Sequence, residues 1–167
     1  MSPIDLRRPS ALDALAVAEL VRRCPPLDMN SLYCNLLQCS HFADCAVVAD
    51  CCGKLVGSVT GYRLPEQPDV LFIWQVAVLE LARGQGLARR MLDHLLARSC
   101  HADVRYLETT ITADNKASWR LFQGWAAASG WPQDKSRLFD GQRDFGGAHP
   151  SEYLLRLGRL VAASVAV

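Results

Sequence analysis

Residues 74–91, WQVAVLELARGQGLARRM, constrain the fold more than any other part of the chain. The apolar run over 70–79 is typical of a buried β-strand, and it is followed closely by the turn Arg83-Gly84-Gln85-Gly86. Amphipathic helical spacing begins directly after the turn and continues to about residue 98. The sequence therefore predicts a strand, a glycine turn and a helix in close succession.

A glycine turn at the start of a helix favours phosphate oxygens, because main-chain N–H groups converge there and the helix dipole adds positive charge. A Walker loop would need a Gly-Lys-Ser/Thr ending that the turn lacks. A dinucleotide fingerprint would need glycine at Arg89, although Glu108 lies at a suitable distance along the chain for a ribose contact. The third pattern, Arg-x-x-Gly-x-Ala, matches Arg83 to Ala88. A plain tight turn is the alternative to all three.

The remaining pattern predicts one mixed α/β domain over residues 1–167. Ser10 and Asp13 predict a capping box at the first helix, and Leu32, Leu36 and Leu37 share one side of the second. Residues 130–147 are interpreted as a loop with one short strand near Leu138, and the tail 161–167 as either ordered or frayed. We expect strands over 4–6, 45–50, 54–62, 70–79, 104–112 and 151–160, and helices over 11–21, 30–38, 87–98 and 115–128.

Charge and composition narrow the class of protein. A net charge of +1 gives no electrostatic reason to expect nucleic acid or an anionic membrane as partner. No apolar run approaches the roughly 18 residues of a membrane span, and the first residues do not resemble a signal peptide. The seven cysteines are odd in number and form no Cys-x-x-Cys pair. We therefore expect a cytoplasmic protein with free thiols and no metal.

Several motifs together carry a family resemblance. Arg83-x-x-Gly86-x-Ala88, after VAVLELA, resembles the acetyl-CoA motif of the GCN5-related N-acetyltransferases, and the order of elements is similar. Between Asp28 and Gly158, further segments resemble the L-2,4-diaminobutyrate acetyltransferases of ectoine synthesis: LDMNSLYCNLL, HFAD, LFIWQVAV, RGQGLARRML, LETTITADNKASWRLF and His149-x-x-Glu152.

This resemblance implies a fold, a reaction and an assembly. The fold is α/β (α+β), with a mixed, mostly antiparallel central sheet flanked by helices. The implied reaction moves the acetyl group of acetyl-CoA to the 4-amino group of diaminobutyrate. The implied partners are coenzyme A, the diamino acid and a second copy of the chain in a homodimer.

For coenzyme A, the resemblance implies main-chain contacts along the central strand and the glycine turn, and contacts of the pantetheine arm with the start of the helix at 115. A bulge in the strand would expose main-chain N–H groups, which also suit the developing oxyanion. Asn115 is equally well explained as a helix cap. The implied residues are Val76, Ala77, Val78, Arg83, Gly84, Gln85, Gly86, Leu87, Ala88, Asn115 and Ser118.

A diamino acid presents amines and a carboxylate, and the same resemblance places candidate partners for them. Asp28 would anchor an ammonium group, with capping of the second helix as the alternative. Trp74 is either a pocket wall or a core residue. Thr110 and Thr112 share one face of their strand, so their hydroxyls could meet the substrate carboxylate, although threonine also suits strands by shape.

Acetylation requires that the acceptor amine lose a proton, since the pKa of a side-chain amine in water is about 10.4. Glu152 and His149 are the candidates for this transfer; Pro150 stands where relatives carry another acid. Phe122 occupies the position of a tyrosine that protonates the leaving thiolate in many family members. Tyr33 is a possible substitute donor, and a buried Tyr33 packed on the sheet is the alternative.

Three other functions remain open from the sequence. The same fold could acetylate another amino acid, a polyamine or a protein amine. Phe122 and Pro150 also fit a non-catalytic acyl-CoA-binding module. A nucleotide-binding protein is the third, and it depends on the dinucleotide interpretation of the turn.

Overall fold

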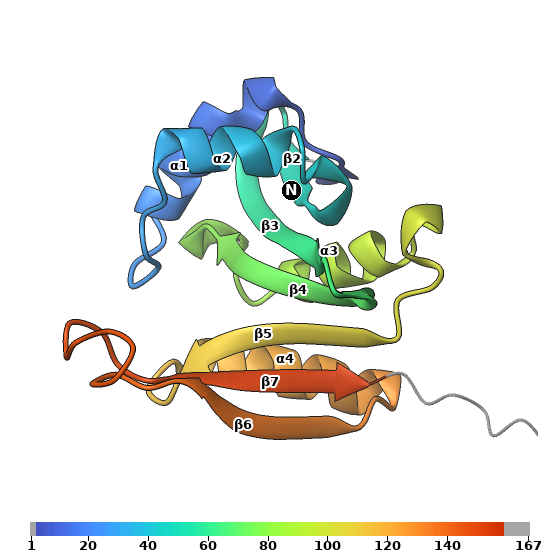
Figure 1. Cartoon of the computed structure of the whole chain (residues 1–167). Coiled ribbons are helices and arrows are strands. Elements are labelled where there is room, and N and C mark those ends of the chain that lie inside the picture. Colours follow the sequence, from blue (N-terminus) through green and yellow to red (C-terminus); the bar gives the residue numbers. More distant parts are fainter. Residues whose placement is uncertain (1–2, 159–167) are drawn as a thin grey trace, which may run out of the picture. The chain divides into compact units, whose positions relative to one another are not determined.

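The computed structural model describes residues 3–158, and it contains two compact units, Met1–Val104 and Arg105–Val167 (Figure 1). The first unit holds β1 (Asp5–Arg7), α1 (Ala14–Arg22), α2 (Leu32–Cys39), β2 (Val47–Cys51), β3 (Lys54–Leu64), β4 (Gln67–Val78) and α3 (Leu87–Leu96). The second holds β5 (Tyr106–Thr112), α4 (Lys116–Ser129), β6 (Gln133–Phe139) and β7 (Glu152–Gly158). The expected strand at 151–160 and the tail 161–167 extend beyond the described residues.

In the first unit, β1, β2, β3 and β4 pair in that order, and each pair is antiparallel. Helix α3 covers one face of this sheet, because a Cβ on Gly57 of β3 would point at the Met91 side chain, 3.0 Å away. Helices α1 and α2 lie on the other side of the strands (Figure 1). Leu87, Met91 and Leu92 of α3 are buried, as the helical spacing predicted.

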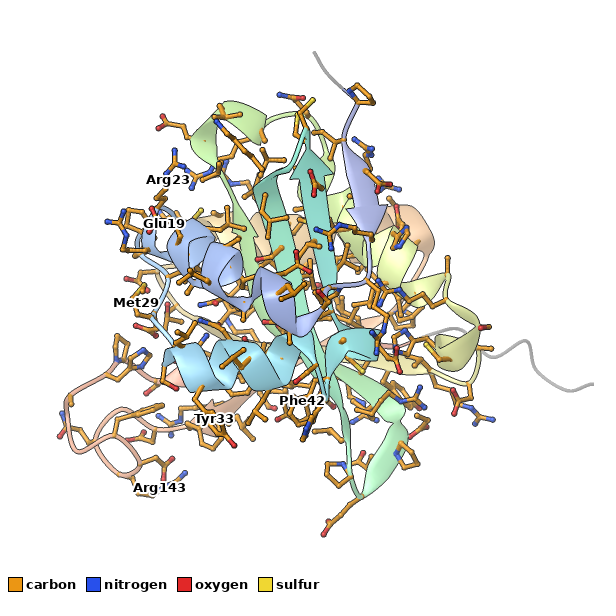
Figure 2. All side chains as sticks on the ribbon, turned by 90° about the horizontal axis from the view of Figure 1, so that it is seen from above. Glu19, Arg23, Met29, Tyr33, Phe42 and Arg143 are labelled. Carbon is orange, nitrogen blue, oxygen red and sulfur yellow. The ribbon has the colours of Figure 1, made fainter. Side chains whose placement is uncertain are left out.

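The N-terminal helices confirm one prediction and correct another. The capping box is present, with the Asp13 carboxylate accepting from the Ser10 N–H at 2.7 Å. Helix α2, however, is polar on its buried side: Asn35 and Gln38 are buried, whereas Leu32 and Leu36 are 48% and 38% exposed. Leu37 is half-buried, so the side of α2 that carries Leu32 and Leu36 faces outward. Figure 2 shows Met29, Tyr33 and Phe42 at α2 and its flanks, and these side chains are also exposed.

A β-bulge interrupts β4. Thr60 of β3 is the Cα partner of Gln75, whereas the next residue, Gly61, is the partner of Ile73, so Trp74 is the additional residue on β4. A Cβ on Gly61 would lie 2.4 Å from the carbonyl oxygen of Phe72. Glycine is therefore required where the bulged strand approaches the backbone of β3.

This close approach makes Gly61→Ala destabilising. We expect a loss of about 2–3 kcal/mol in the free energy of unfolding, since the methyl group must displace main chain. Gly124→Ala, in the exposed interior of α4 with open space around its Cβ, should gain about 0.5–1 kcal/mol. Urea unfolding of the two variants measures both effects. Equal effects would contradict the bulge geometry.

In the second unit, β7 lies between β5 and β6 and pairs antiparallel with both. Figure 1 shows α4 against one face of these strands. The expectation of a loop with one short strand near Leu138 was too cautious, because β6 spans Gln133–Phe139. All residues of β6 are exposed, so the strand has no buried alternation that a sequence pattern could reveal.

Buried thiols of the first unit serve packing. Burial raises the pKa of Cys39 to about 11. The Cys45 Sγ lies 3.6 Å from His101 Nε2, and the other ring nitrogen of His101 lies 2.8 Å from the Leu95 carbonyl oxygen. Burial lowers the pKa of His101 and raises that of Cys45, so the pair is held as neutral groups. Within the described residues, no helix has the length and apolar character to cross a bilayer.

Candidate functional site

The glycine turn has the geometry that the sequence predicted. β4 ends at Val78, and α3 begins at Leu87 with Gly86 as its N-cap. Gly84 and Gly86 have φ angles of 74° and 69°, a region that favours glycine. A Cβ added at either position would meet no atom within 4 Å. The turn is therefore open around both glycines, and the first N–H groups of a helix have no acceptor within the helix, which together suit an anion.

Two side chains of the turn fix it to its surroundings. Arg83 Nε donates to the Val78 carbonyl oxygen at 3.0 Å, which ties the turn to the end of β4. Gln85 Nε2 donates to the Leu81 carbonyl oxygen at 3.2 Å. Both residues thus hold the backbone of the turn, whatever contacts they make with a phosphate. Leu87, the first residue of α3, is buried, and Ala88 is half-buried.

The strand that precedes the turn carries a bulge, but it lies at Trp74 and not at residues 76–78, where it was expected. Val76, Ala77 and Val78 pair in regular register with Val59, Ser58 and Gly57 of β3. The irregular backbone thus lies at one end of the proposed pantetheine contact. Ala77 is buried, and Val76 and Val78 are half-buried.

In the first unit, Gln75 links the segment that contains the proposed substrate residue Asp28 to the strand that carries the other, Trp74. Gln75 Nε2 donates to the Asp28 carbonyl oxygen at 2.9 Å, and Asn30 Nδ2 donates to Gln75 Oε1 at 3.3 Å. Trp74 is 47% exposed, so it is no core residue. Its ring packs edge-on against Tyr62, with ring centroids 6.2 Å apart.

The structure decides between the alternatives that the sequence left open for Tyr33 and Asp28. Tyr33 is 70% exposed, which rules out the buried, sheet-packed alternative and leaves its hydroxyl accessible. The cap of α2 is Ser31, whose hydroxyl oxygen accepts from the Cys34 N–H at 3.1 Å. Asp28 is therefore not the cap of this helix. Phe122 is buried in α4 and has no hydroxyl to donate.

In the second unit, Asn115 caps α4, and its side-chain oxygen accepts from the Ser118 N–H at 3.1 Å. The predicted cap is confirmed, and the proposed contact of both residues with pantetheine stays a prediction. Trp119 Nε1 donates to the Thr112 carbonyl oxygen at 3.0 Å. These bonds fix the start of α4 to the end of β5.

The two threonines of β5 differ in the hydrogen bonds that their hydroxyl groups make. The Thr112 hydroxyl donates to the Asp114 carboxylate at 2.7 Å, and this bond lowers the pKa of Asp114. Its hydrogen is therefore used locally, although its oxygen can still accept. Thr110 is half-buried on the same face of β5. Thr112 is directly opposite Glu152 in the pairing of β5 with β7.

His149 and Glu152 lie together at the start of β7. His149 Nε2 is 3.9 Å from Glu152 Oε1, and His149 Nδ1 is 2.8 Å from the Pro150 carbonyl oxygen. Since a carbonyl can only accept, Nδ1 carries the hydrogen and Nε2 faces the carboxylate with its lone pair when the ring is neutral. A proton bound to either group would interact favourably with the other.

The loop between β6 and β7 surrounds His149. The Asp140 carboxylate accepts from the N–H groups of Gln142 and Arg143, and these bonds lower its pKa. The Phe145 ring lies 4.8 Å from the His149 ring, centroid to centroid. A cavity of about 470 Å³ is lined by Asp140, Gly141, Gln142, Gly147, Ala148, His149, Pro150 and Ser151.

Two residues of these sites were missed by sequence reasoning. Gln75 had a visible signal, because it is the polar residue inside the apolar run VLFIWQVAVL. Phe145 had none, since its place beside His149 depends on the folding of the loop.

The structure does not support the dinucleotide interpretation, which needs Glu108 for a ribose contact. Glu108 is buried and accepts from Arg156 Nη1 at 2.6 Å. Among residues 3–158, no group of three or more His, Cys, Asp or Glu side chains is arranged to hold a metal ion.

The family model described as the acetyltransferase (GNAT) family matches residues 12–125. The chain belongs to this family. This acetyltransferase is 51% identical to the L-2,4-diaminobutyric acid acetyltransferase of Methylotuvimicrobium alcaliphilum over 155 residues, which cover 93% of the chain and 90% of the relative. The namesake from Vibrio cholerae is likewise 51% identical, with the same coverage.

A solved structure resembles this acetyltransferase over nearly its whole length. It is the diaminobutyrate acetyltransferase EctA from Paenibacillus lautus, in complex with its substrate L-2,4-diaminobutyric acid and coenzyme A. The TM-score is 0.92 at 36% identity, and the match covers 97% of this chain and 98% of the other. The predicted N-acetyltransferase fold is therefore confirmed.

Proposed function

We propose that the protein transfers the acetyl group of acetyl-CoA to the 4-amino group of L-2,4-diaminobutyrate, giving N4-acetyl-L-2,4-diaminobutyrate for ectoine synthesis and so for protection against osmotic stress. The observation that carries this proposal is the match to EctA, whose structure holds diaminobutyrate and coenzyme A. The glycine turn supports it independently, because its open, positive-φ backbone suits a diphosphate.

The first unit supplies groups that suit two ligands. The N–H groups at the start of α3 bind the diphosphate of coenzyme A, and the main chain of residues 76–78 meets its pantetheine arm. Asp28 anchors an ammonium group, and the exposed Trp74 ring forms a wall beside it. In the second unit, Asn115 and Ser118 are the residues proposed for contact with pantetheine.

Glu152 accepts the proton of the acceptor ammonium group, with His149 stabilising the charge changes beside it. The freed amine attacks the thioester carbonyl carbon, a C–N bond forms and the C–S bond breaks, and the second proton that the nitrogen loses passes to the departing sulfur. A free thiol in water has a pKa of about 8.5, so the thiolate departs without strong acid help, and Tyr33 is the available hydroxyl. Thr110 donates its hydroxyl hydrogen to the substrate carboxylate, and Thr112 joins it by exchanging its bond to Asp114 for one to the substrate.

A panel of acceptors tests the proposal. Purified protein with acetyl-CoA should release free thiol much faster with diaminobutyrate than with ornithine, lysine or putrescine, and NMR should place the acetyl group on N4. If another amine is acetylated faster, that amine and not diaminobutyrate is the acceptor. Tight binding of acetyl-CoA without thiol release for any amine would favour the acyl-CoA-binding module.

We also propose a homodimer in the cytoplasm. Leu32 and Leu36 on the outward side of α2, with Met29 and Phe42 beside that helix, form a group of exposed apolar side chains and not a single exposed residue. A second copy of the chain would cover this group. Sedimentation velocity should give a dimer for the wild type and a monomer for Leu36→Asp. Leu81→Asp, at an exposed leucine between β4 and α3, should leave the dimer intact. The seven free cysteines fit a reducing compartment.

A further inference from the structure

Gln75 is a polar residue in the middle of an apolar strand, and both ends of its side-chain amide are engaged. Its NH₂ group donates to the Asp28 carbonyl oxygen at 2.9 Å, and its oxygen accepts from Asn30 at 3.3 Å. Both partners lie in the connection between α1 and α2, which is neither helix nor strand at these residues. One side chain thus bridges β4 to both ends of the segment 28–30.

The β-bulge determines where this side chain points. Because Trp74 is the additional residue of β4, Gln75 comes to lie opposite Thr60 on the sheet face away from α3. The exposed Trp74 ring is its neighbour in the chain, and Tyr62 holds that ring edge-on. A rigid part of the sheet therefore carries Trp74 and, through Gln75, sets the position of Asp28.

We infer that Gln75 is a positioning residue that fixes the Asp28 backbone, and with it the point at which the Asp28 carboxylate holds one amino group of the diamino acid, so that the other amino group is the one acetylated. The inference rests on the proposed function. The two amines of diaminobutyrate differ mainly in their position along a short chain. A displaced anchor would therefore weaken binding and also expose the wrong amine to acetylation.

Gln75→Leu tests this directly, because leucine has similar bulk and makes no hydrogen bond. We expect KM for diaminobutyrate to rise about tenfold, the loss that corresponds to roughly one or two hydrogen bonds, with KM for acetyl-CoA changed less than about twofold. The ratio of N2- to N4-acetylated product, measured by NMR, should rise at least about fivefold. Gln67→Leu is the matched control, since Gln67 is exposed on the same strand and far along it from the bulge.

Two further variants separate the two bonds. Gln75→Glu keeps the shape and the acceptor toward Asn30 but removes the donor to the Asp28 carbonyl, so it should resemble Gln75→Leu. Asn30→Ala removes the longer bond and should have a smaller effect in the same direction. If Gln75→Leu does not fold, Gln75→Glu and Asn30→Ala decide the question.

The outcomes distinguish this inference from the proposed function. A wild type that leaves diaminobutyrate unacetylated overturns the proposed function. The positioning role is then judged by amide hydrogen exchange, which should be faster at residues 28–30 in Gln75→Leu and unchanged in Gln67→Leu. Unchanged exchange there, or a wild-type KM and product ratio in an active Gln75→Leu enzyme, would overturn the inference. A fall in kcat alone would also count against it.

Discussion

Glu152→Gln should lower kcat for diaminobutyrate acetylation about 100- to 1,000-fold at neutral pH. Glutamine has the shape of glutamate, but its amide does not accept a proton from an ammonium group. The neighbouring His149 Nε2, 3.9 Å away, should provide the residual activity. KM for acetyl-CoA should stay close to that of the wild type, because this residue does not contribute to the glycine turn.

A pH series checks the reason for the loss. Because the pKa of an amine in water is about 10.4, the deprotonated fraction of the acceptor grows about tenfold per pH unit below that value. The variant should therefore regain rate as pH rises from about 7 to about 9, more steeply than the wild type does. Glu66→Gln, at an exposed turn between β3 and β4, is the control with the same chemical change. A Glu152→Gln enzyme within about threefold of the wild type would exclude this residue as the base.

Gly86→Val should weaken coenzyme A binding about 100-fold or more, measured by calorimetry. At a φ of 69°, valine is strained, and its side chain would fill the open space in front of the N–H groups at the start of α3. Lost anion contacts and steric exclusion then act in the same direction. The conformational strain should also cost about 1–2 kcal/mol of folding stability.

Gly130→Val separates the two effects. Gly130 ends α4 with a φ of 68° and also has open space around its Cβ, so the strain is matched. This control should lose similar stability and keep its coenzyme A affinity once folded. Equal affinities for the two variants would mean that the turn at residues 83–88 is not where the diphosphate binds.

The order of the elements was predictable because their signals are local. The apolar run before the glycine turn, the Ser10–Asp13 capping box and the Asn115 cap each depend on neighbours in the chain, and the structure has all three. The glycines of the turn were informative for the same reason, since a positive φ is a local demand. Sequence motifs thus located the glycine turn well.

Features that depend on distant parts of the chain were not predictable in this way. The outward leucines of α2 have helical spacing, and the spacing alone does not say which side is buried. The bulge at Trp74 requires Gly61, thirteen positions earlier in the chain, to admit the backbone of Phe72. Gln75 was visible as a polar interruption, but its link to Asp28 spans 47 positions.

The exposed edge strand β6 bears on whether the protein associates with itself at high concentration. It forms the outer strand of the three in its unit, so its free side could template growth of fibrils from copies of itself. Antiparallel self-pairing about Lys135 would oppose two lysines, pairing about Ser136 would oppose Lys135 to Arg137, and pairing about Arg137 would oppose two arginines. Like-charge repulsion in each register disfavours such polymerisation, and this edge should keep the protein dispersed at high concentration.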